Sequence, residues 1–318
     1  MKRLSSGEWY GTTATLLKRS NDYSLISYQC NGTGICMDYP LFPGINLVFM
    51  DFNCKDTFSE PIPNRDILDI RHYQQGRVEF ELQNQRVFHM GEDEFCINAL
   101  SNTPASYSFP FGRCSGVSFV IDRGSIDEAT MCQMLLYGID VEAIGKDLEL
   151  DLHWYVCKTP AQLSHIFTEL YAAKGKEPLP YFRIKSLELL YQVQKLRNED
   201  RYLATYYTKT YIEIVKKIRE KMIEDLEIRL PLEELVSHAN ISMVTFQAIF
   251  KQIYGDTPYA HLKKYKMNCA AIRLRDCNES ISQIAISLGY SNASKFSKAF
   301  QAVFGVLPKD YRQQNQSI

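Results

Sequence analysis

Residues 241–274 have the sequence ISMVTFQAIFKQIYGDTPYAHLKKYKMNCAAIRL, and residues 281–312 have the sequence ISQIAISLGYSNASKFSKAFQAVFGVLPKDYR. Both stretches contain two Phe residues four positions apart, then an aromatic residue, a Gly and a Pro. The first copy of this motif is Phe246, Phe250, Tyr254, Gly255 and Pro258, and the second, displaced by 50, is Phe296, Phe300, Phe304, Gly305 and Pro308. An internal repeat in fixed register predicts two copies of one structural unit.

Upstream of the motif the displacement between the two copies is 49 instead of 50. The matching residues are Leu235, Ile241 and Ser242 in the first copy and Ile284, Tyr290 and Ser291 in the second. The second copy therefore carries one extra residue, and we expect it to lie in a turn.

Each copy predicts a helix, a tight turn and a second helix. In the first copy, Pro231 stands where a helix can begin, and residues 238–241 form the predicted turn. Ser242 is a suitable N-cap for the second helix, which Gly255 ends. In the second copy, Gly289-Tyr290 is the predicted turn and Ser291 the predicted N-cap. The Phe pairs lie at i, i+4 on one face, where they can pack against the preceding helix.

The segment from Pro258 to about Arg275 is predicted to be one longer helix that connects the two copies. About 18 residues at about 1.5 Å per residue span roughly 27 Å. A helix-turn-helix places its second helix in a major groove, and one turn of DNA is about 34 Å. The connecting helix is therefore long enough to hold two recognition helices in successive major grooves on one DNA face.

These residues also resemble a known family, the AraC/XylS family of bacterial transcription regulators, in its tandem helix-turn-helix domain. The second copy carries the more specific signal, in Ile284-Ala285, Gly289-Tyr290, Phe296, Phe300, Phe304-Gly305, Pro308 and Tyr311-Arg312. The resemblance covers roughly the last 90 residues. It implies a sequence-specific DNA-binding transcription regulator, with activation as the usual mode, that responds to a small-molecule effector. It also implies RNA polymerase as a partner and a cytoplasmic protein that joins the nucleoid when bound to DNA.

Residues that meet DNA must point away from the Phe pairs. Carried over by position, the resemblance implies DNA contacts from Ser242, Val244, Gln247, Ala248, Lys251, Lys266, Ser291, Asn292, Ser294, Lys295 and Lys298. Gln247 can pair with adenine and Val244 can touch a thymine methyl group. Lys298 can reach a guanine edge or a phosphate, whereas Lys295 is better placed for phosphate. Members of the family usually carry Arg at Ala248 and Lys266, which puts the roles of these two positions in doubt.

Charge is distributed unevenly along the chain. The 318 residues carry a net charge of −1, but from Arg229 onward there are 11 Lys or Arg against 6 Asp or Glu. That segment is therefore +5 and the remainder −6, as expected for a localised phosphate-binding surface on an acidic body. The alternative is ordinary surface charge, because +5 over 90 residues is modest.

Composition excludes several other classes. Nine Cys residues show no CxxC pair, so we expect free thiols and no disulfide framework. We expect no signal peptide, because no apolar run follows Lys2 and Arg3, and we expect no membrane partner, because no segment approaches about 20 apolar residues.

Upstream of the repeat we expect two further regions. Residues 1–125 contain short runs of apolar residues, or of alternating apolar and polar residues, separated by turn residues. This pattern predicts a β-barrel or jelly roll similar to the cupin-like sensing domain of the family. HYQQGRVEFEL, residues 72–82, resembles a strand pair of its siderophore-responsive subgroup. Residues 126–225 predict a helical connector, whose apolar stripes pack within the chain or form a homodimer. Residues 226–318 form the predicted all-α DNA-binding domain, so the fold class is multi-domain α and β.

Effector and metal sites are harder to predict in the β region. Arg71, His72 and Tyr73 are candidate effector-binding residues, although strand alternation predicts that only one side chain of such a triplet points inward. His72 and His89 are isolated, without the His-x-His spacing of a cupin metal centre. We therefore expect no metal, no cofactor and no enzyme activity. The alternative functions are a helical protein-interaction scaffold and a metal-dependent cupin enzyme.

Overall fold

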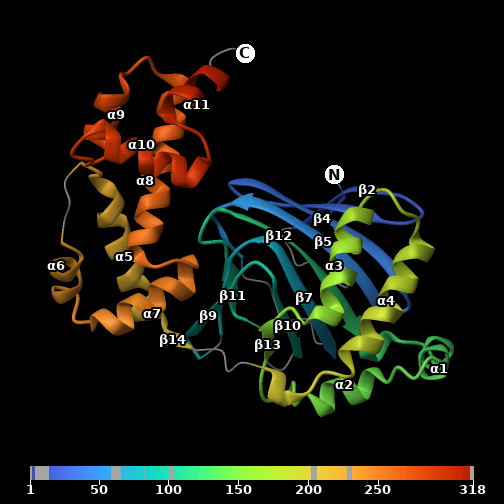
Figure 1. Cartoon of the computed structure of the whole chain (residues 1–318). Helices are drawn as coiled ribbons and strands as arrows, with labels where there is room; N and C mark the ends of the chain where they lie inside the picture. The colour runs from blue at the N-terminus through green and yellow to red at the C-terminus, as the bar shows by residue number, and fades with distance from the viewer. Residues whose placement is uncertain are drawn as a thin grey trace. The chain divides into compact units, whose positions relative to one another are not determined.

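The computed structural model describes residues 2–3, 14–58, 66–82, 84–99, 104–201, 206–227 and 231–315. The chain forms two compact units, Met1–Tyr206 and Tyr207–Ile318. We call them the N-terminal unit and the C-terminal unit and describe each by itself (Figure 1).

The N-terminal unit is built on a large antiparallel sheet with a smaller sheet against it. The large sheet has the order β1 (Lys2–Arg3), β2 (Ala14–Arg19), β3 (Ser24–Tyr28), β4 (Gly32–Phe42), β5 (Ile45–Cys54), β12 (Arg113–Asp122), β7 (Ile67–Gly76), β10 (Glu94–Ala99) and β13 (Tyr155–Lys158). In the smaller sheet β9 (Arg86–Met90), β8 (Val78–Glu81), β11 (Ser106–Ser108) and β6 (Thr57–Phe58) are neighbours in that order.

Strand alternation divides the apolar residues of this unit between two cores. On one face of the large sheet, Phe49 and Phe119 pack with Phe167 and Phe182 of the helices α3 (Ala161–Ala173) and α4 (Leu179–Val193) (Figure 1). On the other face, the side chains fill the space between the sheets. That second core includes Phe52, Phe58, Tyr73, Phe80, Phe88 and Trp154.

The predicted fold class, a β-rich N-terminal region followed by an all-α C-terminal domain, is confirmed, but of the expected β-barrel or jelly roll the large sheet does not form a closed barrel. Among the residues that the structure describes, β1 and β13 are opposite edges of the large sheet and do not pair with each other. Closure is not needed to bury this sheet, because α3 and α4 cover one face and the smaller sheet packs on the other.

The glycines at the start of strand β4 follow a turn and belong to the strand. Residues 29–31 separate β3 from β4, and Gly32 and Gly34 lie inside β4. At Gly32 the backbone φ is +140°, and an added Cβ would lie 2.2 Å from the carbonyl oxygen of Asn53. Here glycine permits close approach of β5 instead of marking a loop.

The segment 126–225, expected as a helical connector, is divided between the two units. Helices α1 (Glu128–Leu136), α2 (Val141–Asp147), α3 and α4 belong to the N-terminal unit, together with strand β13. The last helix of the segment, α5 (Lys209–Glu224), belongs to the C-terminal unit and follows the short strand β14 (Tyr207–Thr208).

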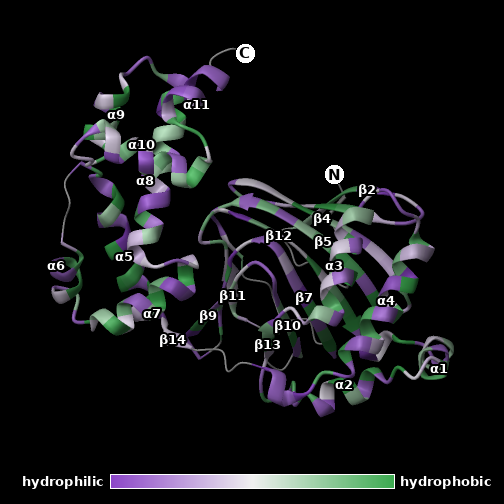
Figure 2. Cartoon of the chain, viewed as in Figure 1, coloured by the Kyte–Doolittle hydropathy of each residue, from purple (hydrophilic) through white to green (hydrophobic). Residues whose placement is uncertain are grey.

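The C-terminal unit consists of helices after β14. They are α5, α6 (Leu232–Ser237), α7 (Met243–Tyr254), α8 (Pro258–Asp276), α9 (Ile281–Ser287), α10 (Ala293–Phe304) and α11 (Pro308–Asn315). The predicted connecting helix, Pro258 to about Arg275, is confirmed as α8. Hydrophilic and hydrophobic residues alternate along these helices, as expected where each buries one side (Figure 2).

One core of this unit joins α8 to the second copy of the repeat. Met267, Ala270 and Leu274 of α8 pack with Phe296 and Phe300 of α10, and all five side chains are fully buried. The rings of Phe296 and Phe300 are 5.9 Å apart, and Phe304 and Tyr311 extend the aromatic cluster. This core fixes the orientation of α10 relative to α8.

We predict that Phe296→Ala lowers the free energy of unfolding by about 3–5 kcal/mol, because truncation leaves a cavity in a closely packed core. Urea unfolding followed by circular dichroism measures the change. Val303→Ala on the same helix is the matched control, since Val303 is 38% exposed. Equal stability of the two variants would place Phe296 outside the core.

Candidate functional site

Two turns with left-handed backbone define the two helix-turn-helix copies. Between α6 and α7, Asn240 has φ +53°, and between α9 and α10, Gly289 has φ +73°. Asn and Gly tolerate this conformation better than other residues. The two positions differ by 49 in sequence, so they are equivalent turn residues in the two copies.

The helix N-caps locate the extra residue of the second copy. The side chain of Ser242 accepts a hydrogen bond from the backbone N–H of Thr245, which confirms it as the cap of α7. In the second copy Asn292 caps α10 by accepting from the N–H of Lys295, so the predicted cap Ser291 is wrong. Ser242 and Asn292 differ by 50, like the Phe pairs, and Ser291 is therefore the inserted residue.

The first recognition helix, α7, buries one face and exposes the other. Phe246 and Phe250 are fully buried. Val244 is 78% exposed, and Gln247, Ala248 and Lys251 are also exposed. The candidate base-reading residues of α7 therefore share a solvent-facing surface. Ser242 is exposed at the start of the same helix.

The second recognition helix, α10, has the same arrangement. Ser294, Lys295 and Lys298 are exposed, opposite the buried Phe296 and Phe300. Ser291 and Asn292 are exposed at its start. Within the described residues no ion pair is formed by Lys251, Lys295 or Lys298, whereas Lys264 is 2.8 Å from Asp256. These three ammonium groups are available for phosphate or base contacts.

Lys266 differs from these three lysines because its side chain has a hydrogen-bond partner within the chain. Its ammonium is partly buried and donates a hydrogen bond of 2.9 Å to the carbonyl oxygen of Leu226. The same carbonyl would be 2.7 Å from a Cβ added at Gly289. Lys266 therefore holds the segment that follows α5 close to the turn of the second copy.

Helix α5 is attached to the first copy through Arg219. Its Nε donates to Nε2 of His261 at 3.3 Å, and its guanidinium lies 5.6 Å from the ring centres of Tyr254 and Tyr265. His261 also packs against Phe250 and is buried. Burial, followed by the positive charge of Arg219, lowers the pKa of His261 to about 4. The imidazole is therefore neutral near pH 7.

In the N-terminal unit, the candidate effector residues alternate along β7, so that His72 faces the opposite side of the sheet from Arg71 and Tyr73. Arg71 faces the space between the sheets, where its guanidinium lies 5.6 Å from the ring centre of Phe80 and its Nε donates to Asp69 at 2.7 Å. His72 faces the helices and stacks on Phe167, with the ring centres 4.2 Å apart. The ring of Tyr73 packs toward Phe80. Strand pleating separates Arg71 from His72, as the alternation rule requires.

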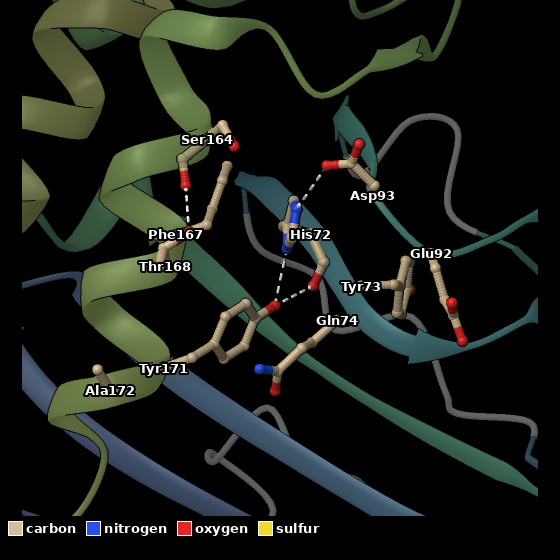
Figure 3. A pocket seen from close by; sticks show the side chains of 10 residues that line it. All are labelled: His72, Tyr73, Gln74, Glu92, Asp93, Ser164, Phe167, Thr168, Tyr171 and Ala172. Atoms are coloured by element: carbon tan, nitrogen blue, oxygen red, sulfur yellow. Dashed lines mark hydrogen bonds and ion pairs between the residues drawn. The ribbon is translucent and has the colours of Figure 1, made fainter. Parts of the chain in front are cut away.

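A cleft of about 530 Å³ opens between β7, the turn before β10 and helix α3 (Figure 3). Its lining residues are His72, Tyr73, Gln74, Glu92, Asp93, Ser164, Phe167, Thr168, Tyr171 and Ala172. Sequence reasoning found His72 and Tyr73 but missed the others. Gly91-Glu92-Asp93 is typical of a turn, and the i, i+4 spacing of Phe167 and Tyr171 is typical of one helix face, so neither pattern by itself points to a cleft.

Hydrogen bonds fix His72 within this cleft. Its Nδ1 lies 2.8 Å from the hydroxyl oxygen of Tyr171, and that hydroxyl donates to the backbone carbonyl of His72 at 3.0 Å (Figure 3). Its Nε2 is 3.9 Å from Oδ1 of Asp93. Burial lowers the pKa of His72 to about 4, although the Asp93 carboxylate opposes this shift. Burial also raises the pKa of the Tyr171 hydroxyl.

Two searches of the described residues gave negative results. No group of three or more His, Cys, Asp or Glu side chains is arranged there to hold a metal ion. No helix in that part of the chain has the length and apolar character needed to span a membrane.

Residues 235–314 match the family model of a helix-turn-helix domain. The chain is 36% identical over 84 residues to the HTH-type transcriptional regulator AlkR of Acinetobacter baylyi, covering 26% of this chain and 28% of that protein. It is 38% identical over 79 residues to a putative AraC-like transcription regulator of Streptomyces lividans, covering 25% of this chain and 26% of the relative.

A third relative is named as an activator. The RCS-specific HTH-type transcriptional activator RclR of Escherichia coli is 36% identical over 87 residues, covering 27% of this chain and 31% of that protein. The chain thus matches less than a third of the length of each of these three relatives. The part of this chain that matches them is about the length of the helix-turn-helix domain at residues 235–314.

We predict that Asn292→Ala destabilises the C-terminal unit by about 0.5–2 kcal/mol, because α10 loses its cap. Ser291→Ala should change stability by less than about 0.5 kcal/mol, as expected for an exposed residue without such a role. Chemical unfolding of both variants makes the comparison. A larger loss for Ser291→Ala than for Asn292→Ala would contradict the position of the insertion.

We also predict that acid weakens the C-terminal unit through His261. Its pKa is lowered to about 4 in the folded chain, and an unfolded His titrates near about 6.5. Between these values the unfolded state binds more protons, so the free energy of unfolding falls as pH falls through this window. Urea unfolding of His261→Gln between pH 7 and pH 4 should show a shallower decline than the native chain. His238→Gln, at an exposed histidine of the same unit, is the control.

Proposed function

We propose that this chain, whose residues 235–314 form an AraC-type helix-turn-helix domain, is a sequence-specific DNA-binding transcription regulator. One observation carries the proposal. Each of the two helix-turn-helix copies buries its Phe pair and exposes the opposite face of its second helix. A duplicated unit with two exposed recognition faces fits a ligand with a repeating surface, and duplex DNA is such a ligand.

The connecting helix sets the reach of the two copies. Helix α8 has 19 residues, which corresponds to about 28 Å at about 1.5 Å per residue. Neighbouring major grooves on one face of DNA are about 34 Å apart. Because α6 and α7 precede α8 and α9 and α10 follow it, the domain can place α7 and α10 in successive grooves.

The exposed side chains suggest how sequence is read. Gln247 has the bidentate geometry for adenine, and Val244 offers an apolar contact for a thymine methyl group. In the second copy, Lys298 can reach a guanine edge, and Lys295 can neutralise a phosphate. Ser242 and Asn292 each occupy a helix start, where backbone N–H groups favour phosphate oxygens.

The N-terminal unit supports a sensory role. Its cleft between β7 and α3 lies within one compact unit and combines buried aromatic walls with polar groups, as small-molecule sites do. We propose that an effector binds there and that the regulator is an activator that contacts RNA polymerase, by analogy with the activator among the relatives.

We expect the double variant Lys295→Ala, Lys298→Ala to bind DNA more weakly and with a flatter salt dependence. Lys295 is placed for a phosphate and Lys298 for a guanine edge or a phosphate. Each phosphate contact contributes about 0.9 to the slope of log K against log salt concentration, so the double variant lowers the slope by about 1 to 2. The probe is a DNA fragment enriched from random sequence by the full-length chain, and fluorescence anisotropy gives the affinity at several salt concentrations.

The control removes two positive charges elsewhere. Lys146→Ala, Lys158→Ala changes two exposed lysines of the N-terminal unit and should leave the slope unchanged. The proposal fails if the native chain enriches no DNA sequence. The assignment of DNA contacts to Lys295 and Lys298 fails if both double variants show the native slope of log K against log salt concentration.

A further inference from the structure

In the cleft between β7 and α3, Nε2 of His72 and the carboxylate of Asp93 form no hydrogen bond to any of the described residues. The Tyr171 phenol has one hydrogen, which it donates to the carbonyl oxygen of His72 at 3.0 Å. We therefore assign the Nδ1–H tautomer to His72, in which Nδ1 donates to the phenol oxygen at 2.8 Å. In the neutral imidazole this leaves a lone pair on Nε2.

That lone pair faces a second acceptor. Nε2 of His72 is 3.9 Å from Oδ1 of Asp93, beyond hydrogen-bond distance, and in this tautomer neither atom donates to the other (Figure 3). The His72 side chain is only 8% exposed, so few positions are open to a donor except from the cleft. A single nitrogen about 2.9 Å from each atom spans the gap. Such a nitrogen needs at least two hydrogens.

The charge of the lining selects among possible donors. The residues around the cleft include two carboxylates, Glu92 and Asp93, and no Lys or Arg. One oxygen of Glu92 accepts from the backbone N–H of Gly76 at 3.0 Å, which holds its carboxylate at the rim. A neutral donor such as water satisfies the geometry but leaves the negative charge of the carboxylates uncompensated. A protonated amine or a guanidinium donates the hydrogen bonds and also compensates that charge.

The opposite wall suits the remainder of such a molecule. Phe167 and Tyr171 supply aromatic surface, Ala172 supplies a methyl group, and Ser164 and Thr168 supply hydroxyl groups at the edge. Aromatic side chains beside a cation add a favourable electrostatic contact. The volume of about 530 Å³ lies in the usual range for a small organic ligand.

We propose that this cleft binds an organic cation, a protonated primary amine or guanidine with a short apolar or aromatic body. The head group bridges His72 Nε2 and Asp93 Oδ1 beside Glu92, and the body lies along α3. This assignment names the effector class of the regulator proposed above and rests on that function for its regulatory meaning. The binding itself does not depend on DNA.

The test uses isothermal titration calorimetry of the full-length chain with three ligands that share a phenol ring. Tyramine carries an ammonium group, tyrosol a neutral hydroxyl group and 4-hydroxyphenylacetate a carboxylate. Agmatine serves as a guanidinium probe. We expect one or both cations to bind, at least tenfold more tightly than tyrosol, and the carboxylate not to bind.

Two variants locate the site. Asp93→Asn should weaken cation binding at least tenfold, and it preserves the turn because Asn tolerates the backbone φ of +60° at this position. His72→Phe keeps the ring against Phe167 but removes the acceptor, and it should also weaken binding. Asp147→Asn, at an exposed carboxylate on α2, is the matched control and should bind like the native chain.

Three results would overturn the proposal. They are equal or tighter binding of tyrosol or 4-hydroxyphenylacetate, native cation affinity in Asp93→Asn, and no heat from either cation at concentrations up to about 10 mM. Anisotropy measurements on the same preparations separate the two proposals. If the chain binds DNA but no cation, only the proposed class of ligand is refuted. If it binds a cation but no specific DNA sequence, only the proposed function as a regulator is refuted.

Discussion

The burial of aromatic side chains on a single helix, α8, is the constraint on which the C-terminal unit depends. Near its start, His261 packs with Phe250 and Tyr254 of the first copy. Further along, Met267, Ala270 and Leu274 receive Phe296 and Phe300 of the second copy. Since the buried face of each recognition helix is fixed on α8, its opposite face must point to solvent. Packing thereby places residues that contribute nothing to the core where a ligand can meet them.

The inserted Ser291 shows how a repeat tolerates a change of length. The turn residues Asn240 and Gly289 keep a spacing of 49, and the caps Ser242 and Asn292 keep a spacing of 50. The extra residue is absorbed between the turn and the cap, in an exposed position. The hydrogen bond from Lys266 to the carbonyl oxygen of Leu226 lies beside Gly289 and packs against the turn of the second copy. Helix phase is therefore conserved between the copies, because the insertion comes before the helix begins.

In the N-terminal unit the pleat of β7 decides which residues can share a site. Arg71 and His72 are neighbours in sequence, but they lie on opposite faces of the large sheet. His72 instead meets Tyr171, which is 99 residues away along the chain. The cleft combines a strand, the Glu92–Asp93 turn and helix α3. The carboxylate of Asp93 faces the buried imidazole of His72 there, and the same unit places the Arg71–Asp69 pair in a different environment between its sheets.

The sequence by itself determined what depends on near neighbours: the duplicated helix-turn-helix, the length of α8, the buried Phe pairs and most strands of the β region. These follow from i, i+4 spacing, alternation and residues that end helices, all of which act over a few positions. Only the tertiary structure decided that the large sheet stays open, that Lys266 contacts Leu226 and that His72 faces Asp93 and Tyr171. These features depend on which segments meet across long stretches of chain, and local patterns carry no information about that choice.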